Sequence, residues 1–163
     1  MALDSAQPHG IVRPSKAGAA LYSVLVNIVL IAAKLLVGLL TGSVAILADA
    51  AHSFLDLSAS IFAYAGIRTA AKPADEDHAW GHGKAENISS LIQMFLLGAT
   101  CIAIVIESVR RVVVPGTVRV AWYSFVVVLA AVVIDIVVSR YLQGVSRAHG
   151  GSAALEADAL HFS

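Results

Sequence analysis

Residues 42–56 read GSVAILADAAHSFLD, an apolar stretch that nevertheless contains Asp49, His52 and Asp56. Together with Ser60, these residues follow the i, i+3, i+4 spacing of an α-helix, so their side chains share one helix face. In a membrane-spanning helix such a face must contact protein or water, because lipid cannot form its hydrogen bonds. Ionisable groups at that depth are costly, and each is therefore a candidate functional residue.

The composition of the whole chain places this stretch in a membrane. Hydrophobic residues make up 58% of the 163 residues, charged residues make up 13%, and the mean hydropathy is +0.81. Soluble domains contain about 25% charged residues. The net charge of zero offers no general attraction for nucleic acid, and the single cysteine, Cys101, excludes an internal disulfide. We predict an all-α, polytopic integral membrane protein in contact with the lipid bilayer and without a nucleic-acid partner.

The apolar runs predict how often the chain crosses the bilayer. Crossing a hydrocarbon core of about 30 Å takes about 20 helical residues. We predict four complete spans, near residues 19–40, 43–68, 88–109 and 118–141, and the start of a fifth helix near residue 152. We interpret residues 1–17 as a cytoplasmic N-terminal segment and residues 18–163 as the transmembrane domain.

The distribution of basic residues predicts the orientation of the chain. Cytoplasmic segments of membrane proteins are enriched in lysine and arginine. With the N-terminus inside, seven basic residues face the cytoplasm: Arg13, Lys16, Arg68, Lys72, Lys84, Arg140 and Arg147. Three face the other side: Arg110, Arg111 and Arg119. This excess predicts a cytoplasmic N-terminus.

His52 and Asp56 are the first candidate metal ligands. They are four residues apart on one helix face, so an imidazole nitrogen and a carboxylate oxygen can converge on one ion. Zinc accepts nitrogen and oxygen ligands at about 2.0 to 2.2 Å, so this pair is a plausible half of a tetrahedral site. His161, with Asp158 one turn before it, is a candidate for the other half. The alternative is a His–Asp hydrogen bond that holds two helices together.

Lys34 and Asp49 are expected to form an ion pair. Thr41-Gly42-Ser43 predicts a tight turn that joins the first two spans as an antiparallel hairpin. Counted from this turn at about 1.5 Å per residue, both side chains lie roughly 11 Å along their helices. The pair neutralises both charges and is predicted to serve structure. Asp135, in the fourth span, has no evident partner in the sequence, and its role stays open.

The loop between the second and third spans contains a second group of candidate metal ligands. Asp75, His78 and His82 occur within eight residues, and the two histidines are four apart. Histidine and carboxylate ligands at short spacing are typical of metal sites. One alternative is a solvated loop without a metal. Another is a membrane di-metal oxygenase, but such an enzyme needs more histidines than the six in this chain, none of which are adjacent.

Several of these segments closely resemble the cation diffusion facilitator family of metal–proton antiporters. The resemblance covers most of the chain from about Val24 onward, and the two middle motifs together are highly specific. It lies in Gly42-Ser43-Val44-Ala45-Ile46-Leu47-Ala48-Asp49-Ala50 and His52-Ser53-Phe54-Leu55-Asp56, in Lys72-Pro73-Ala74-Asp75 through His78, in Gly81-His82-Gly83-Lys84-Ala85-Glu86, and in Ala157-Asp158-Ala159-Leu160-His161.

The resemblance implies a Y-shaped homodimer of six-helix protomers that exports zinc-like divalent ions from the cytoplasm in exchange for protons. We expect the protein to lie in a bacterial inner (plasma) membrane. The family's central metal site takes two ligands from the second helix, matched by His52 and Asp56, and two from the fifth, of which His161 is matched. Its loop site is matched by Asp75, His78 and His82. Zinc is the favoured ion, with Fe2+, Mn2+, Co2+ and Cd2+ as alternatives.

The family pattern also extends past Ser163. We expect the remainder of the fifth helix, the sixth helix and a cytoplasmic C-terminal domain to be absent, which makes this chain an N-terminal transmembrane fragment. Its fourth central ligand would be an acidic residue four positions after His161. The alternative function is therefore a truncated member that binds metal or a partner without transporting it.

Overall fold

The computed structural model describes residues 14–113 and 122–162, which form five α-helices and, within these ranges, no β-strand. The helices are α1 (Lys16–Thr41), α2 (Val44–Ala70), α3 (Lys84–Val113), α4 (Trp122–Ala148) and α5 (Ala153–His161). The first four are long and apolar enough to cross a membrane, and α5 has nine residues. The predicted all-α, polytopic class is confirmed.

The helices extend beyond the predicted spans. α3 begins at Lys84, ahead of the predicted start near residue 88, and α4 continues to Ala148, past the predicted end near residue 141. Hydropathy marks where the lipid-facing run stops, whereas backbone hydrogen bonding continues into the polar ends of a helix. Predictions that concern residues 1–13 and 114–121, including Arg13, Arg119 and the first part of the fourth span, lie outside the described residues.

The hairpin of α1 and α2 is set by three short-range features. Ser15 caps the N-terminus of α1 by accepting a hydrogen bond from the Gly18 N–H at 3.0 Å. Gly42 ends α1 with a φ of 63°, in the left-handed region that glycine adopts without strain, and its N–H donates to the carbonyl of Gly38. Ser43 then caps α2. The predicted turn at Thr41-Gly42-Ser43 is therefore present and reverses the chain.

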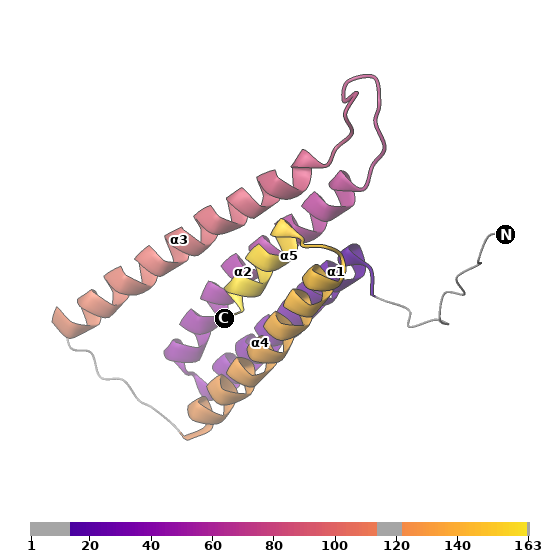
Figure 1. Cartoon of the computed structure of the whole chain (residues 1–163). Coiled ribbons are helices and arrows are strands. Elements are labelled where there is room, and N and C mark those ends of the chain that lie inside the picture. The colour runs from indigo at the N-terminus through magenta and orange to yellow at the C-terminus, as the bar shows by residue number, and fades with distance from the viewer. Residues whose placement is uncertain (1–13, 114–121, 163) are drawn as a thin grey trace.

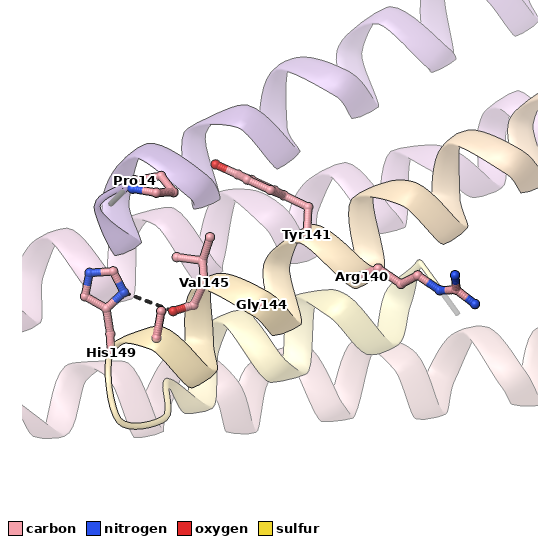
Figure 2. Close-up of a pocket in the computed structure, with 7 residues that line it drawn as sticks. Pro14, Arg140, Tyr141, Gly144, Val145 and His149 are labelled. Atoms are coloured by element: carbon pink, nitrogen blue, oxygen red, sulfur yellow. Dashed lines mark hydrogen bonds between the residues drawn. The ribbon is translucent and has the colours of Figure 1, made fainter. Parts of the chain in front are cut away.

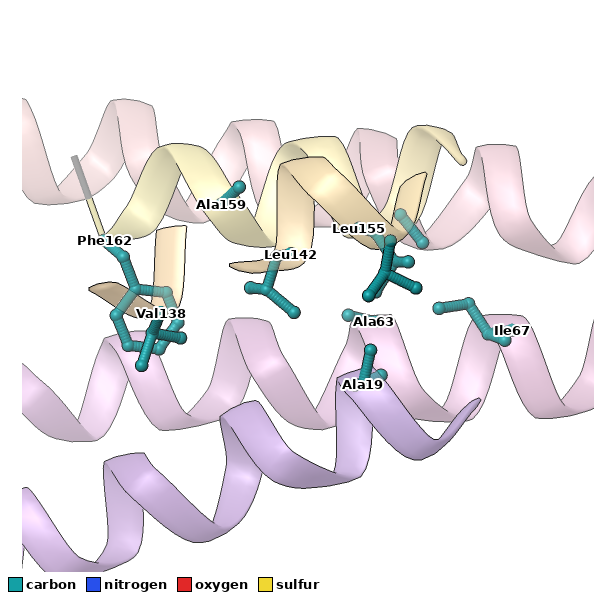
Figure 3. Close-up of a cluster of buried hydrophobic side chains, with 11 residues drawn as sticks. Ala19, Ala63, Ile67, Val138, Leu142, Leu155, Ala159 and Phe162 are labelled. Carbon is teal, nitrogen blue, oxygen red and sulfur yellow. The ribbon is translucent and has the colours of Figure 1, made fainter. Parts of the chain in front are cut away.

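The helices pack around a narrow hydrophobic core. This core lies near the end of the molecule where α1 begins. Figure 1 shows α5 among α1, α2 and α4, with α3 running beside α2 and α5, and contacts between these elements agree. Small residues such as Ala19 and Ala63 bring the backbones close together, while Leu142 and Leu155 fill the space between them (Figure 3). Large apolar side chains, among them Leu39 and Phe95, are exposed on the outside of the bundle, as expected of helices that cross a bilayer.

Candidate metal sites

The short helix α5 brings the last candidate ligand against α2. Ser152 caps α5 and accepts from the Leu155 N–H, so the helix starts directly after the turn that follows α4. His161, at the end of α5, is nearly fully buried, with 1% of its side chain exposed. Its Nδ1 lies 3.8 Å from Oδ1 of Asp56. Residues more than 100 positions apart in the sequence are thereby neighbours.

The geometry of the His161–Asp56 pair suits two ligands on either side of an ion. A separation of 3.8 Å between Nδ1 and Oδ1 is too long for a hydrogen bond. Two ligands at about 2.1 Å from a tetrahedral zinc ion lie about 3.4 Å apart. The Nε2 of His161 lies 3.0 Å from the backbone carbonyl of Gln93. An Nε2–H that donates there leaves the Nδ1 lone pair directed towards Asp56, as a metal ligand requires.

Two buried imidazole nitrogens, one on α2 and one on α5, have no hydrogen-bond partner among the described residues. They are Nε2 of His52 and Nδ1 of His161. Buried polar atoms are nearly always hydrogen-bonded, so these two nitrogens call for an explanation, as do Gln93 Oε1 and Thr100 Oγ1 on α3. Among the described residues, one ligand atom each from His52, Asp56 and His161 do not all lie within 4.8 Å of one another. The structure brings Asp56 and His161 together, and His52 does not complete a group of three with them.

The predicted partners Lys34 and Asp49 are also brought together. Lys34 Nζ lies 3.0 Å from Asp49 Oδ2 and donates a hydrogen bond to Ser53 Oγ at 2.9 Å. The lysine side chain is 10% exposed and the aspartate 45%. Asp135 of α4, which the sequence left without a partner, is half-buried and interacts electrostatically with Lys34, Asp49 and Asp56. The polar face of α2 therefore lies against α1 and within reach of α4.

A buried polar cluster that the sequence analysis missed joins α1, α2 and α5. It contains Ser23, Asn27, Ser60 and Asp158, each 3% exposed or less. The signal that could have revealed it lies in α1, where Ser23, Asn27 and Lys34 share the buried helix face. Polar residues at this spacing in an apolar span indicate a face that contacts other helices.

The loop site is the tightest group of candidate ligands in the described residues. One ligand atom each from Asp75, His78 and His82 lies within 4.8 Å of the other two. Asp75 Oδ1 is 3.0 Å from His78 Nδ1, and Asp75 Oδ2 is 3.3 Å from His82 Nε2. The structure therefore brings together all three of the residues that the sequence predicted for this loop.

The loop backbone holds these side chains in place. The His78 N–H donates to Asp75 Oδ1 at 2.8 Å, and the Gly81 N–H donates to the His78 carbonyl at 2.9 Å. Nδ1 of His82 lies 3.2 Å from the carbonyl of Pro73, which leaves Nε2 to face Asp75. Desolvation acts to raise the pKa of Asp75, but hydrogen bonds from His78 and the charge of His82 outweigh it, so the pKa is lowered.

A surface pocket lies apart from both groups of candidate ligands. It is formed where the start of α1 meets the end of α4, and none of the predicted metal ligands line it (Figure 2). In it, Nδ1 of His149 is hydrogen-bonded to the carbonyl of Val145 at 2.9 Å. The lining residues are Pro14, Arg140, Tyr141, Gly144, Val145, Ala148 and His149.

The long apolar helices define a polytopic membrane protein with ionisable groups paired between its spans. A sequence model described as the cation efflux transmembrane domain matches residues 20–163. The chain belongs to this cation efflux, or cation diffusion facilitator, family. The family points to a transporter of divalent metal cations rather than to an enzyme.

Individual relatives agree with this family. The chain is 33% identical over 144 residues to the cation-efflux pump FieF of Cronobacter sakazakii, covering 88% of this chain and 48% of that protein. It is 36% identical over 140 residues to the pump of the same name from Shewanella oneidensis, covering 86% of this chain and 47% of that protein. The chain thus spans about half the length of these relatives.

Proposed function

We propose that this chain forms the zinc-binding transmembrane part of a proton-coupled exporter, with His52, Asp56 and His161 as ligands of the transported ion. The observation that carries the proposal is the pair of buried, unpartnered imidazole nitrogens on His52 and His161. The approach of His161 Nδ1 to Asp56 Oδ1 adds to it. A divalent cation would supply the missing partner for each of these atoms.

Competition between metal and protons would drive transport. Zinc binds neutral imidazole and ionised carboxylate, so arrival of the ion releases protons and protonation releases the ion. A pH difference across the membrane then drives zinc outwards. In this proposal residues 1–17 lie in the cytoplasm, residues 18–163 belong to the transmembrane domain of a bacterial inner-membrane protein, and the full-length protein is a homodimer. Zinc is preferred because imidazole ligands suit it, with the other divalent ions as weaker substrates.

Loss of His161 is expected to abolish tight zinc binding at the central site. His161→Gln removes the Nδ1 ligand, and we expect the zinc affinity of the purified protein to fall about 100-fold or more, measured by calorimetry. His149→Gln is the matched control, because His149 lies in the surface pocket away from Asp56, and it should leave the affinity within about twofold. Unchanged affinity in His161→Gln would remove His161 from the site.

Transport is tested on the same variants in vesicles. Wild-type protein should move zinc when a pH gradient is imposed, and His161→Gln should not. Zinc flux that persists after the gradient is collapsed would contradict proton coupling. Zinc binding without any flux in the wild type would favour the alternative function, in which this chain binds metal without transporting it.

We also propose that Asp75, His78 and His82 bind a second zinc ion in the loop. The support is the convergence of three ligand atoms within 4.8 Å on a loop ordered by backbone hydrogen bonds. His82 Nε2 faces Asp75, as a ligand nitrogen would. Because the loop lies outside the spans, this site can exchange ions with water.

The lowered pKa of Asp75 predicts how the loop site responds to pH. The Asp75 carboxyl is ionised at any pH above its ordinary pKa of 3.8, and it stays ionised until the pH falls through the lowered pKa. Its contribution to zinc binding is therefore lost only in acid below that ordinary value. Zinc binding near neutral pH therefore displaces no proton from Asp75. We expect Asp75→Ala to weaken zinc binding about tenfold or more, although the ionised Asp75 carboxylate contributes no proton to those that zinc releases.

This loop experiment is best done in the His161→Gln background, so that the central site does not contribute. Calorimetry in buffers of different ionisation enthalpy gives the protons released. Asp77→Ala, an exposed neighbour outside the group of three, is the control and should change neither quantity. Release of about one proton fewer in Asp75→Ala would mean that Asp75 is protonated before zinc binds, against this prediction.

A further inference from the structure

Asp158 is a buried carboxyl group that the zinc sites do not use. It is 0% exposed and lies on α5, one turn before His161. Its Oδ2 is 2.6 Å from Ser23 Oγ on α1, and its Oδ1 is 2.7 Å from Ser60 Oγ on α2. The two hydroxyls are themselves 2.9 Å apart. Three oxygen-bearing groups from three helices thus contact one another in a closed ring.

The ring contains more contacts than the two hydroxyls have protons. Each of its three oxygen–oxygen separations is within hydrogen-bond distance, so each needs one proton between its oxygens. A serine hydroxyl has only one hydrogen to donate. If Asp158 were ionised, both hydroxyls would donate to it, and the Ser23–Ser60 contact would place two oxygens together without a proton.

A protonated Asp158 completes the ring without leaving any group unpaired. Its O–H donates to Ser23, Ser23 donates to Ser60, and Ser60 donates to the other carboxyl oxygen of Asp158. The second lone pair of Ser60 accepts from Asn27 Nδ2 at 2.8 Å, so Asn27 cannot supply the missing proton to the Ser23–Ser60 contact. Every hydrogen and every contact is then used once.

The surroundings of Asp158 do not favour a buried negative charge. In the described part of the chain, no cationic group lies within the 4.0 Å that defines an ion pair with it. The groups from α1 that face it, Ser23 and Asn27, are uncharged. The titratable groups that interact with it are Asp56 on α2, which repels a negative charge, and His161 on its own helix, which attracts one only when the imidazole is protonated. An unpaired buried carboxylate is strongly unfavourable.

We propose that Asp158 carries its own proton in the folded protein and closes a ring of hydrogen bonds with Ser23 and Ser60 that holds α5 against α1 and α2. The ring fixes the rotation and height of α5, and one turn later that helix presents His161 to Asp56. Asp158 is therefore a positioning residue for His161. Its effect on zinc binding rests on the proposed function, whereas its protonation and its effect on stability do not.

Infrared difference spectroscopy tests the proton directly. A protonated carboxyl group has a carbonyl stretching band separate from the bands of carboxylates and amides. At neutral pH this band should be present in the wild type and lost in Asp158→Asn. The control variant Asp77→Asn, in the exposed loop, should leave it unchanged. If Asp158→Asn removes a carboxylate band instead, Asp158 is ionised and the proposal is wrong.

Rescue by asparagine provides the second readout. The amide introduced by Asp158→Asn can donate to Ser23 and accept from Ser60, as the neutral carboxyl does, so the thermal midpoint of this variant should stay within about 3 °C of the wild type. Asp158→Ala leaves both hydroxyls short of a partner and should lower the midpoint by about 5 °C or more. Equal losses in the two variants would overturn the proposal.

Zinc affinity distinguishes this proposal from the proposed function. Asp158→Asn should keep the affinity of the wild type within about threefold, and Asp158→Ala should weaken it about tenfold or more, because His161 is no longer held. If the wild type binds no zinc at the central site, the proposed function fails, while the infrared and thermal results still decide whether Asp158 is protonated.

Discussion

Lys34→Ala alone is expected to destabilise the protein more than the double change of Lys34→Ala with Asp49→Ala does. The ion pair is short, at 3.0 Å between Nζ and Oδ2, and Lys34 is 10% exposed within a membrane-spanning helix. Removing the lysine leaves the Asp49 carboxylate without its partner at a depth where charge is costly. Removing both groups takes that cost away.

The measurement is a double-mutant cycle of equilibrium unfolding in mixed micelles, with Lys34→Ala, Asp49→Ala and the double variant. Ser53→Ala belongs in the same series, because Ser53 accepts a hydrogen bond from Lys34 at 2.9 Å and should cost about 1 kcal/mol. Lys72→Ala, in the exposed loop, is the control for loss of a lysine. Equal destabilisation in both single variants and the double variant would show that the two charges do not stabilise each other.

Gly66→Ala is expected to destabilise the contact between α2 and α3, although alanine is the better helix former. A Cβ at Gly66 would lie 2.1 Å from Ser89 Oγ and 2.4 Å from Ser89 Cβ, closer than atoms can approach. Overpacking of this kind costs about 1–3 kcal/mol, which exceeds the gain of about 0.5–1 kcal/mol from replacing a glycine inside a helix. The helices must separate, and α3 carries the Gln93 carbonyl that is 3.0 Å from His161 Nε2.

The companion variants separate this steric cause from a general effect of the substitution. Gly98→Ala, in α3, has no atom within 4 Å of the added Cβ and should be neutral or slightly stabilising. Ser89→Gly combined with Gly66→Ala should recover most of the lost stability, since it removes the two closest atoms and leaves the Ala85 carbonyl at 3.2 Å. Unfolding in mixed micelles measures all three. Failure of Ser89→Gly to compensate would contradict the steric explanation.

Much of the fold could be predicted because the signals that start, continue and end each helix lie within or next to its own sequence. Long apolar runs, the Gly42 turn and the serine caps act within a few residues of one another, so they are visible in the sequence. The helix ends were predicted less well, as at Ala148, because backbone hydrogen bonds continue where hydropathy falls.

Some of the candidate sites could likewise be predicted from local sequence, whereas others depend on how the helices pack. His52 and Asp56 share a helix face, and Asp75, His78 and His82 share a short loop, so spacing alone was enough to group them. Lys34 and Asp49 could be paired because a tight turn sets the register of the two helices they lie on. Spacing carries no information on which face of α5 meets α2, which decides whether His161 reaches Asp56.

The sequence alone determines three features: that the chain forms membrane-spanning helices, that α2 has a polar face, and which residues form the loop group. All three depend on residues within a few helical turns of one another. Only the tertiary structure decides that Asp56 lies beside His161, that Asp135 faces the same region, and that Ser23, Ser60 and Asp158 close a ring. The physical reason is that contacts between helices depend on their rotation and relative height, which are set by packing all five together rather than by the residues of any one helix.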